Sequence, residues 1–197
     1  TLGDNVTAVS VGGTFDDCQR LAKEAFGRPD LRERAHLTSA NSISLGRLLP
    51  QMVYFAHLAL LAGPDPCPLV SVPSGNFGNL AAGLLARRMG AGIARFEAAT
   101  TVNDTGPRYL ATGRVEPRPS IATLANAMDV GHPSNLERIR WMFADRVEAL
   151  GRVVSASVHT DADVRSAIRE LDERYGYIAD PHTAIAYMGA RRRLDEG

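Results

Sequence analysis

Lysine is almost absent from this sequence of 197 residues. All of its 22 basic residues are arginine except Lys23, and 22 acidic residues balance them, so the formal net charge is zero. Nucleic-acid-binding proteins usually carry a basic excess. The only local basic cluster, Arg191-Arg192-Arg193, is typical of a solvated helix face. We therefore expect no nucleic-acid partner.

Cysteine and long apolar runs are also scarce. The two cysteines, Cys18 and Cys67, form no disulfide framework, and the five histidines show no metal-ligand spacing. No run approaches the ~20 apolar residues of a membrane span, and no signal peptide opens the chain. We expect a cytoplasmic protein with no membrane partner and no metal. The sequence does not choose between a monomer and a homodimer, and it identifies no catalytic residue, because the polarity of a helix start explains His182 better than catalysis does.

Short apolar runs alternate with helical periodicity along the chain. The expected strands cover residues 6–11, 69–72, 93–100 and 152–158. The expected helices cover residues 16–28, 45–63, 80–90 and 160–176, and the second is apolar nearly all round, which predicts burial. Residues 100–135 show little periodicity. This order predicts an α/β fold with an open, twisted, mostly parallel sheet flanked by helices.

A glycine-rich turn, "SGNFGN", separates a strand from a helix at residues 74–79. Gly75 and Gly78 let the backbone wrap an oxyanion, and the first N–H groups of the helix lack partners. No lysine and hydroxyl follow Gly78, so the turn is not a nucleotide-triphosphate loop, and it is not G-x-G-x-x-G either. A phosphate held without lysine fits the 5′-phosphate of pyridoxal phosphate. A tight turn without a ligand is the alternative.

A second polar set precedes the long apolar helix. Asn41, Ser42 and Arg47 place an amide, a hydroxyl and a guanidinium near its start. Arginine offers a fork of charged donors, so the set could bind a second phosphate. The alternative is that Ser42 only caps the helix. Further along the chain, Ser134 and Glu137 have the spacing of a capping box.

Seven segments in this order resemble bacterial threonine synthases: "GTFDDCQ" (13–19), "TSANSIS" (38–44), "RLLPQMVYF" (47–55), "VPSGNFGNLAAG" (72–83), "NDTGPRYLATG" (103–113), "RPSIATLANAMDVGHPSNLERI" (118–139) and "DPHTAIAY" (180–187). The resemblance implies a fold-type-II pyridoxal-phosphate enzyme that converts O-phospho-L-homoserine and water to L-threonine and phosphate. It implies that residues 1–40 are a remnant of the smaller α/β domain and residues 41–197 an incomplete larger domain.

The resemblance also assigns the two polar sets. Gly75, Asn76, Phe77, Gly78 and Asn79 would bind the cofactor phosphate. The substrate phosphate would be bound by Asn41, Ser42, Arg47 and Asn79.

The lysine that such enzymes join to the cofactor is the feature this sequence lacks. A Schiff base requires an amine, and Lys23 is expected on the exposed face of its helix. We therefore expect these 197 residues to be inactive by themselves. Two alternatives remain: a non-catalytic anion-binding or interaction module of the same fold, and a pyridoxal-phosphate lyase for an unphosphorylated hydroxy amino acid.

Overall fold

The computed structural model describes residues 3–63, 65 and 67–196, and the chain divides into two compact units, Thr1–Thr38 and Ser39–Gly197. The first unit contains helices α1 (Phe15–Gly27) and α2 (Pro29–Ala35). A reciprocal capping box between Thr14 and Asp17 starts α1. The strand expected at residues 6–11 does not form, because this segment pairs with no strand and exposes its valines. Lys23 lies exposed on α1, as expected.

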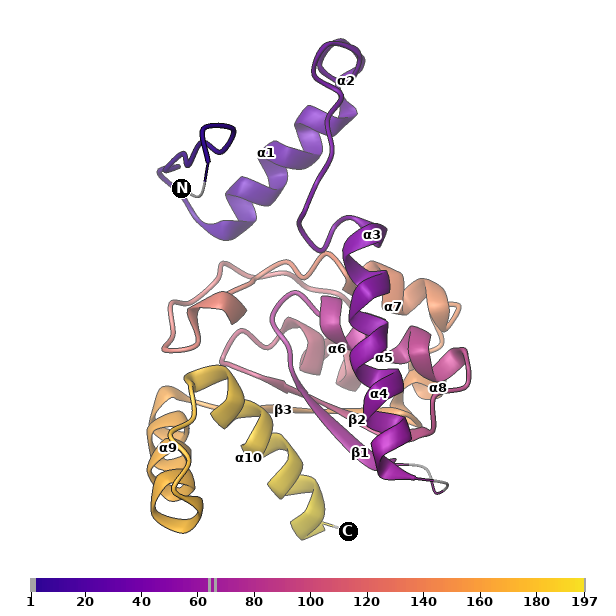
Figure 1. The fold of residues 1–197 in the computed structure, drawn as a ribbon, viewed down its shortest axis with the longest axis vertical. Coiled ribbons are helices and arrows are strands. Elements are labelled where there is room, and N and C mark those ends of the chain that lie inside the picture. Colours follow the sequence, from indigo (N-terminus) through magenta and orange to yellow (C-terminus); the bar gives the residue numbers. More distant parts are fainter. Residues whose placement is uncertain (1–2, 64, 66, 197) are drawn as a thin grey trace. The chain divides into compact units, whose positions relative to one another are not determined.

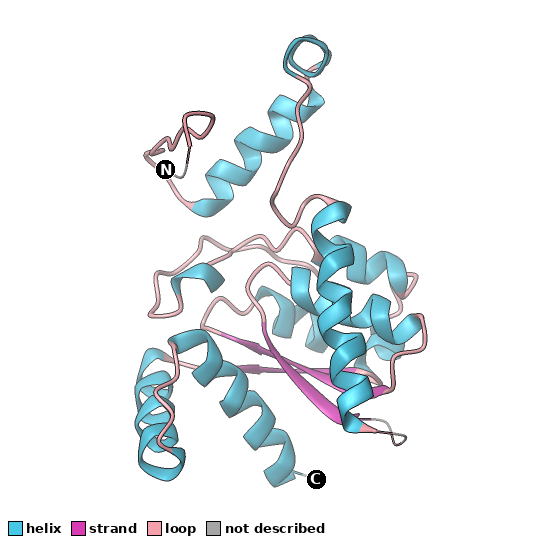
Figure 2. Ribbon diagram, in the orientation of Figure 1, coloured by secondary structure: helices cyan, strands magenta, loops and turns pink. Residues whose placement is uncertain are grey.

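The second unit is built on three parallel strands, as the sequence predicted (Figures 1 and 2). They are β1 (Cys67–Pro73), β2 (Ile93–Thr100) and β3 (Val154–Val158), and they lie in the order β1-β2-β3. Val72 pairs with Ala98, and Ala98 with Ala156. All three carboxyl ends therefore lie at one edge of the sheet, where open α/β proteins bind ligands.

Helices cover both faces of the sheet. Alternate residues of β2 separate two cores, with Phe96 and Ala98 in the core that includes α4 and α5, and Ala99 in the core that includes α9 and α10. The helices of this unit are α3 (Leu45–Leu48), the 3-10 turn η1 (Leu49–Gln51), α4 (Met52–Ala62), α5 (Gly78–Arg88), α6 (Thr105–Thr112), the 3-10 turn η2 (Asn126–Met128), α7 (Leu136–Met142), α8 (Val147–Gly151), α9 (Asp161–Tyr175) and α10 (Pro181–Glu196).

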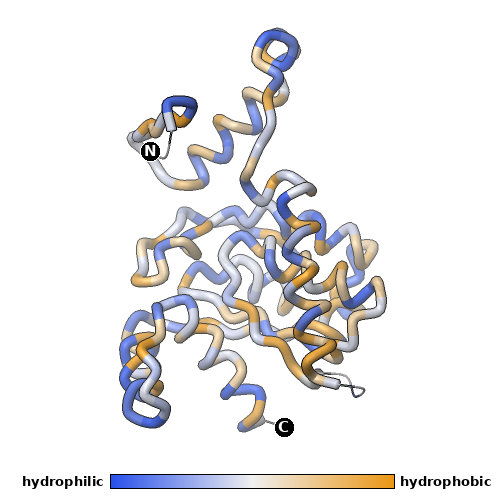
Figure 3. Tube along the Cα trace, in the orientation of Figure 1, coloured by the Kyte–Doolittle hydropathy of each residue, from blue (hydrophilic) through white to orange (hydrophobic). Residues whose placement is uncertain are grey.

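The apolar helix expected to be buried is largely exposed. Within the continuous run from α3 to α4, only Leu48 and Phe55 are buried, because only one face packs against α5. The chain-trace colouring of Figure 3 shows how much of this run is hydrophobic. Among the described residues, the run Leu45–Ala62 is long and apolar enough to cross a membrane, which differs from the expectation that no run approaches that length. Core helices of soluble proteins pass that test too, so it is weak evidence.

The stretch 100–135 is more ordered than its sequence predicts, since it contains α6 and η2. Its remainder is held by side chains. Asn103 donates to the carbonyl of Ile121 at 2.9 Å and accepts from the Ile121 N–H at 2.8 Å. Asp129 accepts from the N–H and hydroxyl of Thr123. These amide and carboxylate side chains replace the missing backbone ladder.

Candidate phosphate-binding site

The glycine-rich turn lies at the carboxyl end of β1 and leads directly into α5. The Ser74 N–H donates to the Ala99 carbonyl at 2.8 Å, which ties the start of the turn to the neighbouring strand. A Cβ on Gly75 would lie 2.6 Å from Met128 Cα, so only glycine fits there. The first N–H groups of α5 have no acceptor within the helix, and its dipole places partial positive charge there. This end of α5 can therefore hold an anion.

The buried side chain of Phe77 anchors the turn. It adopts a left-handed conformation with φ of 60°, and its side chain is only 3% exposed. A Cβ on Gly106 would lie 2.0 Å from Phe77 Cζ, so the ring fills the space that this glycine of α6 leaves open. Because the ring is enclosed, Phe77 can contribute only main-chain groups to a ligand.

Asn76 joins three segments that are distant in the sequence. Its Nδ2 donates to Ser42 Oγ at 2.6 Å. Its Oδ1 accepts from the N–H of Ser134 at 2.7 Å and from the hydroxyl of Ser134 at 3.0 Å. Asn76 thus acts as a structural link between the turn, residues 41–44 and the loop before α7.

These contacts correct two sequence expectations about helix caps. Ser134 does not form a capping box with Glu137, because its hydroxyl bonds to Asn76 and the N-cap of α7 is Asn135. Ser42 does not cap the apolar helix, because α3 begins after Ser44. In both places a long-range hydrogen bond replaces the local one.

Two hydrogen bonds through Gln51 connect Asn79 to Arg47, a member of the predicted substrate set. Its Nδ2 donates to Gln51 Oε1 at 3.1 Å, and Gln51 Nε2 donates to the Arg47 carbonyl at 2.9 Å. No sequence pattern pointed to Gln51.

Two of the residues predicted to bind the substrate phosphate, Asn41 and Ser42, are connected to the turn by hydrogen bonds. The Ser42 hydroxyl donates to Asn41 Oδ1 at 3.1 Å while accepting from Asn76, so both residues join the turn through one chain of bonds. The Arg47 side chain is exposed and takes part in none of the hydrogen bonds or ion pairs among the described residues. Arg47 is connected to the turn only through its carbonyl.

Two residues that sequence reasoning missed complete the site. Arg138 Nη1 donates to the Ser42 carbonyl at 2.9 Å and to Asn135 Oδ1, while its Nη2 donates to the Ile43 carbonyl. We call Ser42, Asn76, Ser134, Asn135 and Arg138 the turn cluster. The available signal was their place in the segment "GHPSNLERI", with Asn135 and Arg138 one helical turn apart.

The turn cluster contains hydroxyls, amides and one guanidinium, and no carboxylate. Next to the N-terminus of α5, this donor-rich composition favours a dianion such as a phosphate monoester. His159 directly follows β3, and its N–H donates to the Thr100 carbonyl at this edge of the sheet at 2.9 Å. Burial lowers the pKa of His159, whose Nε2 lies 2.9 Å from Ser157 Oγ. At neutral pH it therefore adds no charge to the edge.

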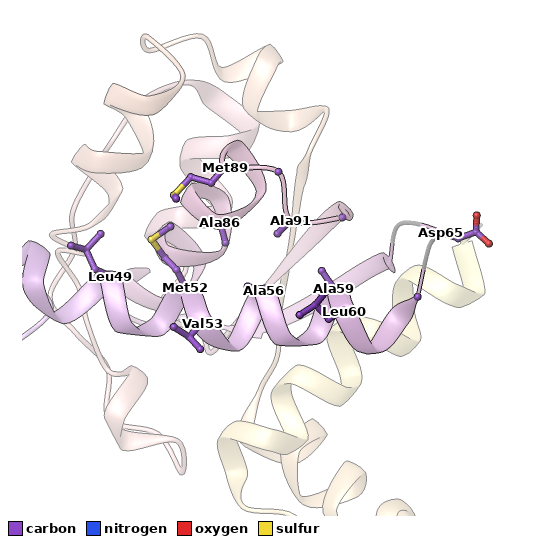
Figure 4. Close-up of a pocket in the computed structure, with 13 residues that line it drawn as sticks. Leu49, Met52, Val53, Ala56, Ala59, Leu60, Asp65, Ala86, Met89 and Ala91 are labelled. Atoms are coloured by element: carbon purple, nitrogen blue, oxygen red, sulfur yellow. The ribbon is translucent and has the colours of Figure 1, made fainter.

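A separate cavity lies away from the turn. It measures about 800 Å³ and runs between α4 and the far end of α5, along Met52, Ala56, Leu60, Ala86 and Met89 (Figure 4). Among the described residues that line it, Asp65 is the only charged one, and it is acidic. An apolar wall without donors cannot hold a phosphate, so this cavity is not part of the anion site.

His182, which the sequence explains by the polarity of a helix start, lies in the first turn of α10. Its N–H and its Nδ1 both lie within hydrogen-bonding distance of Asp180 Oδ1, at 2.8 and 2.9 Å. Asp180 thereby receives the bonds of a capping residue. The hydroxyl of Thr183 is the largest cause that lowers the pKa of Asp180, to about 2.

A parallel α/β sheet with a glycine-containing, donor-rich turn at its carboxyl edge is the arrangement typical of the class of proteins that bind phosphorylated small molecules. The comparisons with known proteins then name the family. The chain belongs to the pyridoxal-phosphate dependent enzymes, whose family model matches residues 1–197. Pyridoxal phosphate is accordingly its cofactor. The glycines and the donor-rich composition of the turn fit the phosphate of that group.

Individual relatives are similar over the whole chain. The threonine synthase of Serratia marcescens is 47% identical over 199 residues, which cover 100% of this chain and 46% of that protein. The crystal structure of threonine synthase from Escherichia coli superposes with a TM-score of 0.92 at 42% identity, covering 98% of this chain and 45% of that one. The chain therefore spans less than half the length of these relatives.

A second solved structure contains the cofactor. The PLP-bound threonine synthase from Brucella melitensis superposes with a TM-score of 0.83 at 34% identity, over 95% of this chain and 46% of that one. Together these structures confirm the fold-type-II architecture expected from the sequence.

Proposed function

We propose that this chain forms part of a pyridoxal-phosphate dependent lyase that converts O-phospho-L-homoserine and water to L-threonine and phosphate, in threonine biosynthesis. The names of the similar proteins support the reaction. The observation that carries it for these residues is the 2.6 Å bond from Asn76 to Ser42, which joins the two predicted phosphate-binding segments into one site.

In this proposal the turn divides its donors between two phosphates. The main-chain groups of Gly75, Asn76, Phe77, Gly78 and Asn79 bind the cofactor phosphate at the N-terminus of α5. Asn41, Ser42 and Arg47, with Asn79, bind the substrate phosphate. Arg47 has a free guanidinium and is connected to Asn79 through Gln51, so it is available to a ligand that arrives from solvent. When bound, pyridoxal phosphate supplies the electron sink for elimination.

The proposal assigns the Schiff-base amine to a residue other than Lys23. Lys23 is exposed on α1, where nothing desolvates its amine. We also propose that residues 1–40 are the remnant of the smaller domain and residues 41–197 the larger, incomplete one. The division of the chain between Thr38 and Ser39 supports this boundary.

Arg47→Ala in the full-length enzyme tests the substrate phosphate site. Loss of a charged hydrogen-bond donor worth about 1.5–3 kcal/mol should raise the KM for O-phosphohomoserine about 10- to 100-fold. Steady-state kinetics measures it. Arg88→Ala is the matched control, because Arg88 is exposed at the opposite end of α5. An unchanged KM in Arg47→Ala would favour a lyase acting on an unphosphorylated amino acid.

A further inference from the structure

Asn135 holds a buried donor that no atom of the described chain accepts. Its side chain is 0% exposed, and its Nδ2 has no hydrogen-bond partner. A buried N–H without an acceptor costs about 1–3 kcal/mol, so such a group calls for an explanation, and a bound ligand is one. The other amide atom, Oδ1, is occupied by Arg138.

Arg138 decides which way this amide points. A guanidinium has only donors, so the amide atom that faces it must be the oxygen. The same guanidinium is held by the carbonyls of Ser42 and Ile43, which prevents it from turning away. The Asn135 Nδ2 is therefore held away from Arg138, in one orientation.

That orientation directs Nδ2 toward the start of α5. A Cβ on Gly78 would lie 3.3 Å from Asn135 Nδ2 and 3.1 Å from Ser42 Cβ. The same Cβ would lie 3.6 Å from Leu48 Cδ2, so Nδ2 lies beside the first residue of α5, next to the N–H groups that begin this helix. The unpartnered amide and the first residue of α5 are therefore neighbours.

We propose that Asn135 donates its free side-chain N–H to a phosphate monoester bound at the N-terminus of α5, and that Arg138 is the positioning residue that orients it. This inference rests on the proposed function only in the identity of the ligand. The phosphate can belong to the cofactor or to the substrate, because both carry the same group. Asn135 adds a side-chain donor to an otherwise main-chain cradle.

Asn135→Asp in the holoenzyme is the direct test. The new carboxylate keeps the acceptor for Arg138 and is a favoured N-cap for α7, so the fold should be retained. It also replaces the donor by a negative charge facing the anion. We expect the affinity for the phosphate ligand to fall about 10- to 100-fold. Asn126→Asp is the matched control, because Asn126 is exposed on η2.

Three ligands separate the sources of the phosphate. Equilibrium dialysis compares pyridoxal phosphate with unphosphorylated pyridoxal, and thermal unfolding with inorganic phosphate reports anion binding without either. If Asn135→Asp weakens pyridoxal phosphate and leaves pyridoxal unchanged, the contact is to the cofactor. If cofactor affinity is unchanged while the KM for the phosphorylated substrate rises and stabilisation by inorganic phosphate is lost, the contact is to the substrate.

Unchanged binding of all phosphate ligands in Asn135→Asp overturns the inference. Asn135→Ser, which removes the amide without adding charge, tests the same contact should the first variant not fold. The proposed function fails separately: a wild-type protein that binds inorganic phosphate through Asn135 but not pyridoxal phosphate would refute the cofactor assignment and support this inference.

The role of Arg138 has its own test. Arg138→Gln should weaken phosphate binding about tenfold, and Arg138→Lys should restore part of it, because a cation again faces Oδ1. In the Asn135→Asp background, Arg138→Gln should cause no further loss of phosphate affinity. An additive loss would show that Arg138 acts only by holding residues 42–43, and the positioning role would be wrong.

Discussion

Two clusters of buried and half-buried polar groups lie in the second unit, and they differ in how their charged side chains are paired. In the turn cluster one guanidinium meets only neutral acceptors, and one amide donor is left over. In the middle of β2, Glu97 is 0% exposed, and its Oε2 accepts from Arg193 Nε at 2.7 Å and from the Ser155 hydroxyl. Each cluster leaves one buried atom without a hydrogen-bond partner among the described residues, Asn135 Nδ2 in the first and Glu97 Oε1 in the second, but only the second pairs opposite charges. Under our proposal an external anion completes the first cluster. The ion pair gives the second cluster a structural role.

The internal pair depends on the close approach of α10 to the sheet. A Cβ on Gly189 would lie 2.8 Å from Ala99 Cβ and 2.9 Å from Ser71 Oγ. This glycine lets α10 pack against β1 and β2, and Arg193 then reaches Glu97 and the Ala156 carbonyl. Substitutions in each region can test whether the two clusters differ in this way.

The largest effect is expected from Arg193→Ala. It leaves the Glu97 carboxylate buried without its counter-ion, which should lower the free energy of unfolding by about 3 kcal/mol. Urea denaturation measures it, with exposed Arg165→Ala as the control. Adding Glu97→Gln removes the buried charge and should recover part of the loss. No recovery would mean that Arg193 acts by packing alone.

Gly106→Ala should affect the turn and not the ion pair. The new methyl group would collide with the Phe77 ring, and overpacking of this kind costs about 1–3 kcal/mol. Moving Phe77 also displaces the turn, so pyridoxal phosphate should bind more weakly. Dialysis and urea denaturation measure the two effects. Gly151→Ala on α8, where a Cβ meets nothing within 4 Å, should change neither by more than about 1 kcal/mol.

The smallest effect concerns the start of α10, the helix that carries Arg193. The pKa of Asp180 is lowered from 3.8 to about 2 in the folded protein, first by the Thr183 hydroxyl. Because the pKa is lower in the folded protein, the ionised Asp180 side chain stabilises the fold fully at pH values above its unfolded-state pKa. This stabilisation is lost as the pH falls from about 4 to about 2. Because the side chain is 57% exposed, about 1 kcal/mol is expected.

Asp180→Asn should remove that loss. The difference in urea midpoint between Asp180→Asn and the wild type should therefore shrink as the pH falls from 5 to 2.5. Asp172→Asn, at an exposed position on α9, should instead keep a constant difference in midpoint from the wild type over this range. Parallel curves for Asp180→Asn and the wild type would contradict the capping role.

Much of the fold could be predicted from local patterns. The strands at residues 69–72, 93–100 and 152–158 and the helix at 160–176 all form, because β-branched runs and capping residues act over a few positions. The apolar run 45–63 is helical, as predicted, but the prediction that it is buried is wrong. Periodicity reports which residues are apolar, and burial depends on what packs against them.

For the candidate site too, the sequence predicted the local element and missed the long-range contacts. The turn at 74–79 follows from two glycines between a strand and a helix, but its partners do not. Ser134 lies 58 residues from Asn76, and Arg138 lies 96 residues from Ser42. Nothing in the local pattern distinguishes a serine that caps its own helix from one that bonds to a distant asparagine.

The sequence by itself determined the class of sheet, the anion-binding turn and the scarcity of lysine, since each depends on residue type and near neighbours. Only the tertiary structure decided which polar groups pair with one another and which remain free. Asn76 became a structural link and Asn135 kept an open donor, although both are asparagines beside helix starts. The reason is that hydrogen-bond satisfaction is settled in three dimensions, by whichever donor and acceptor the fold brings within reach.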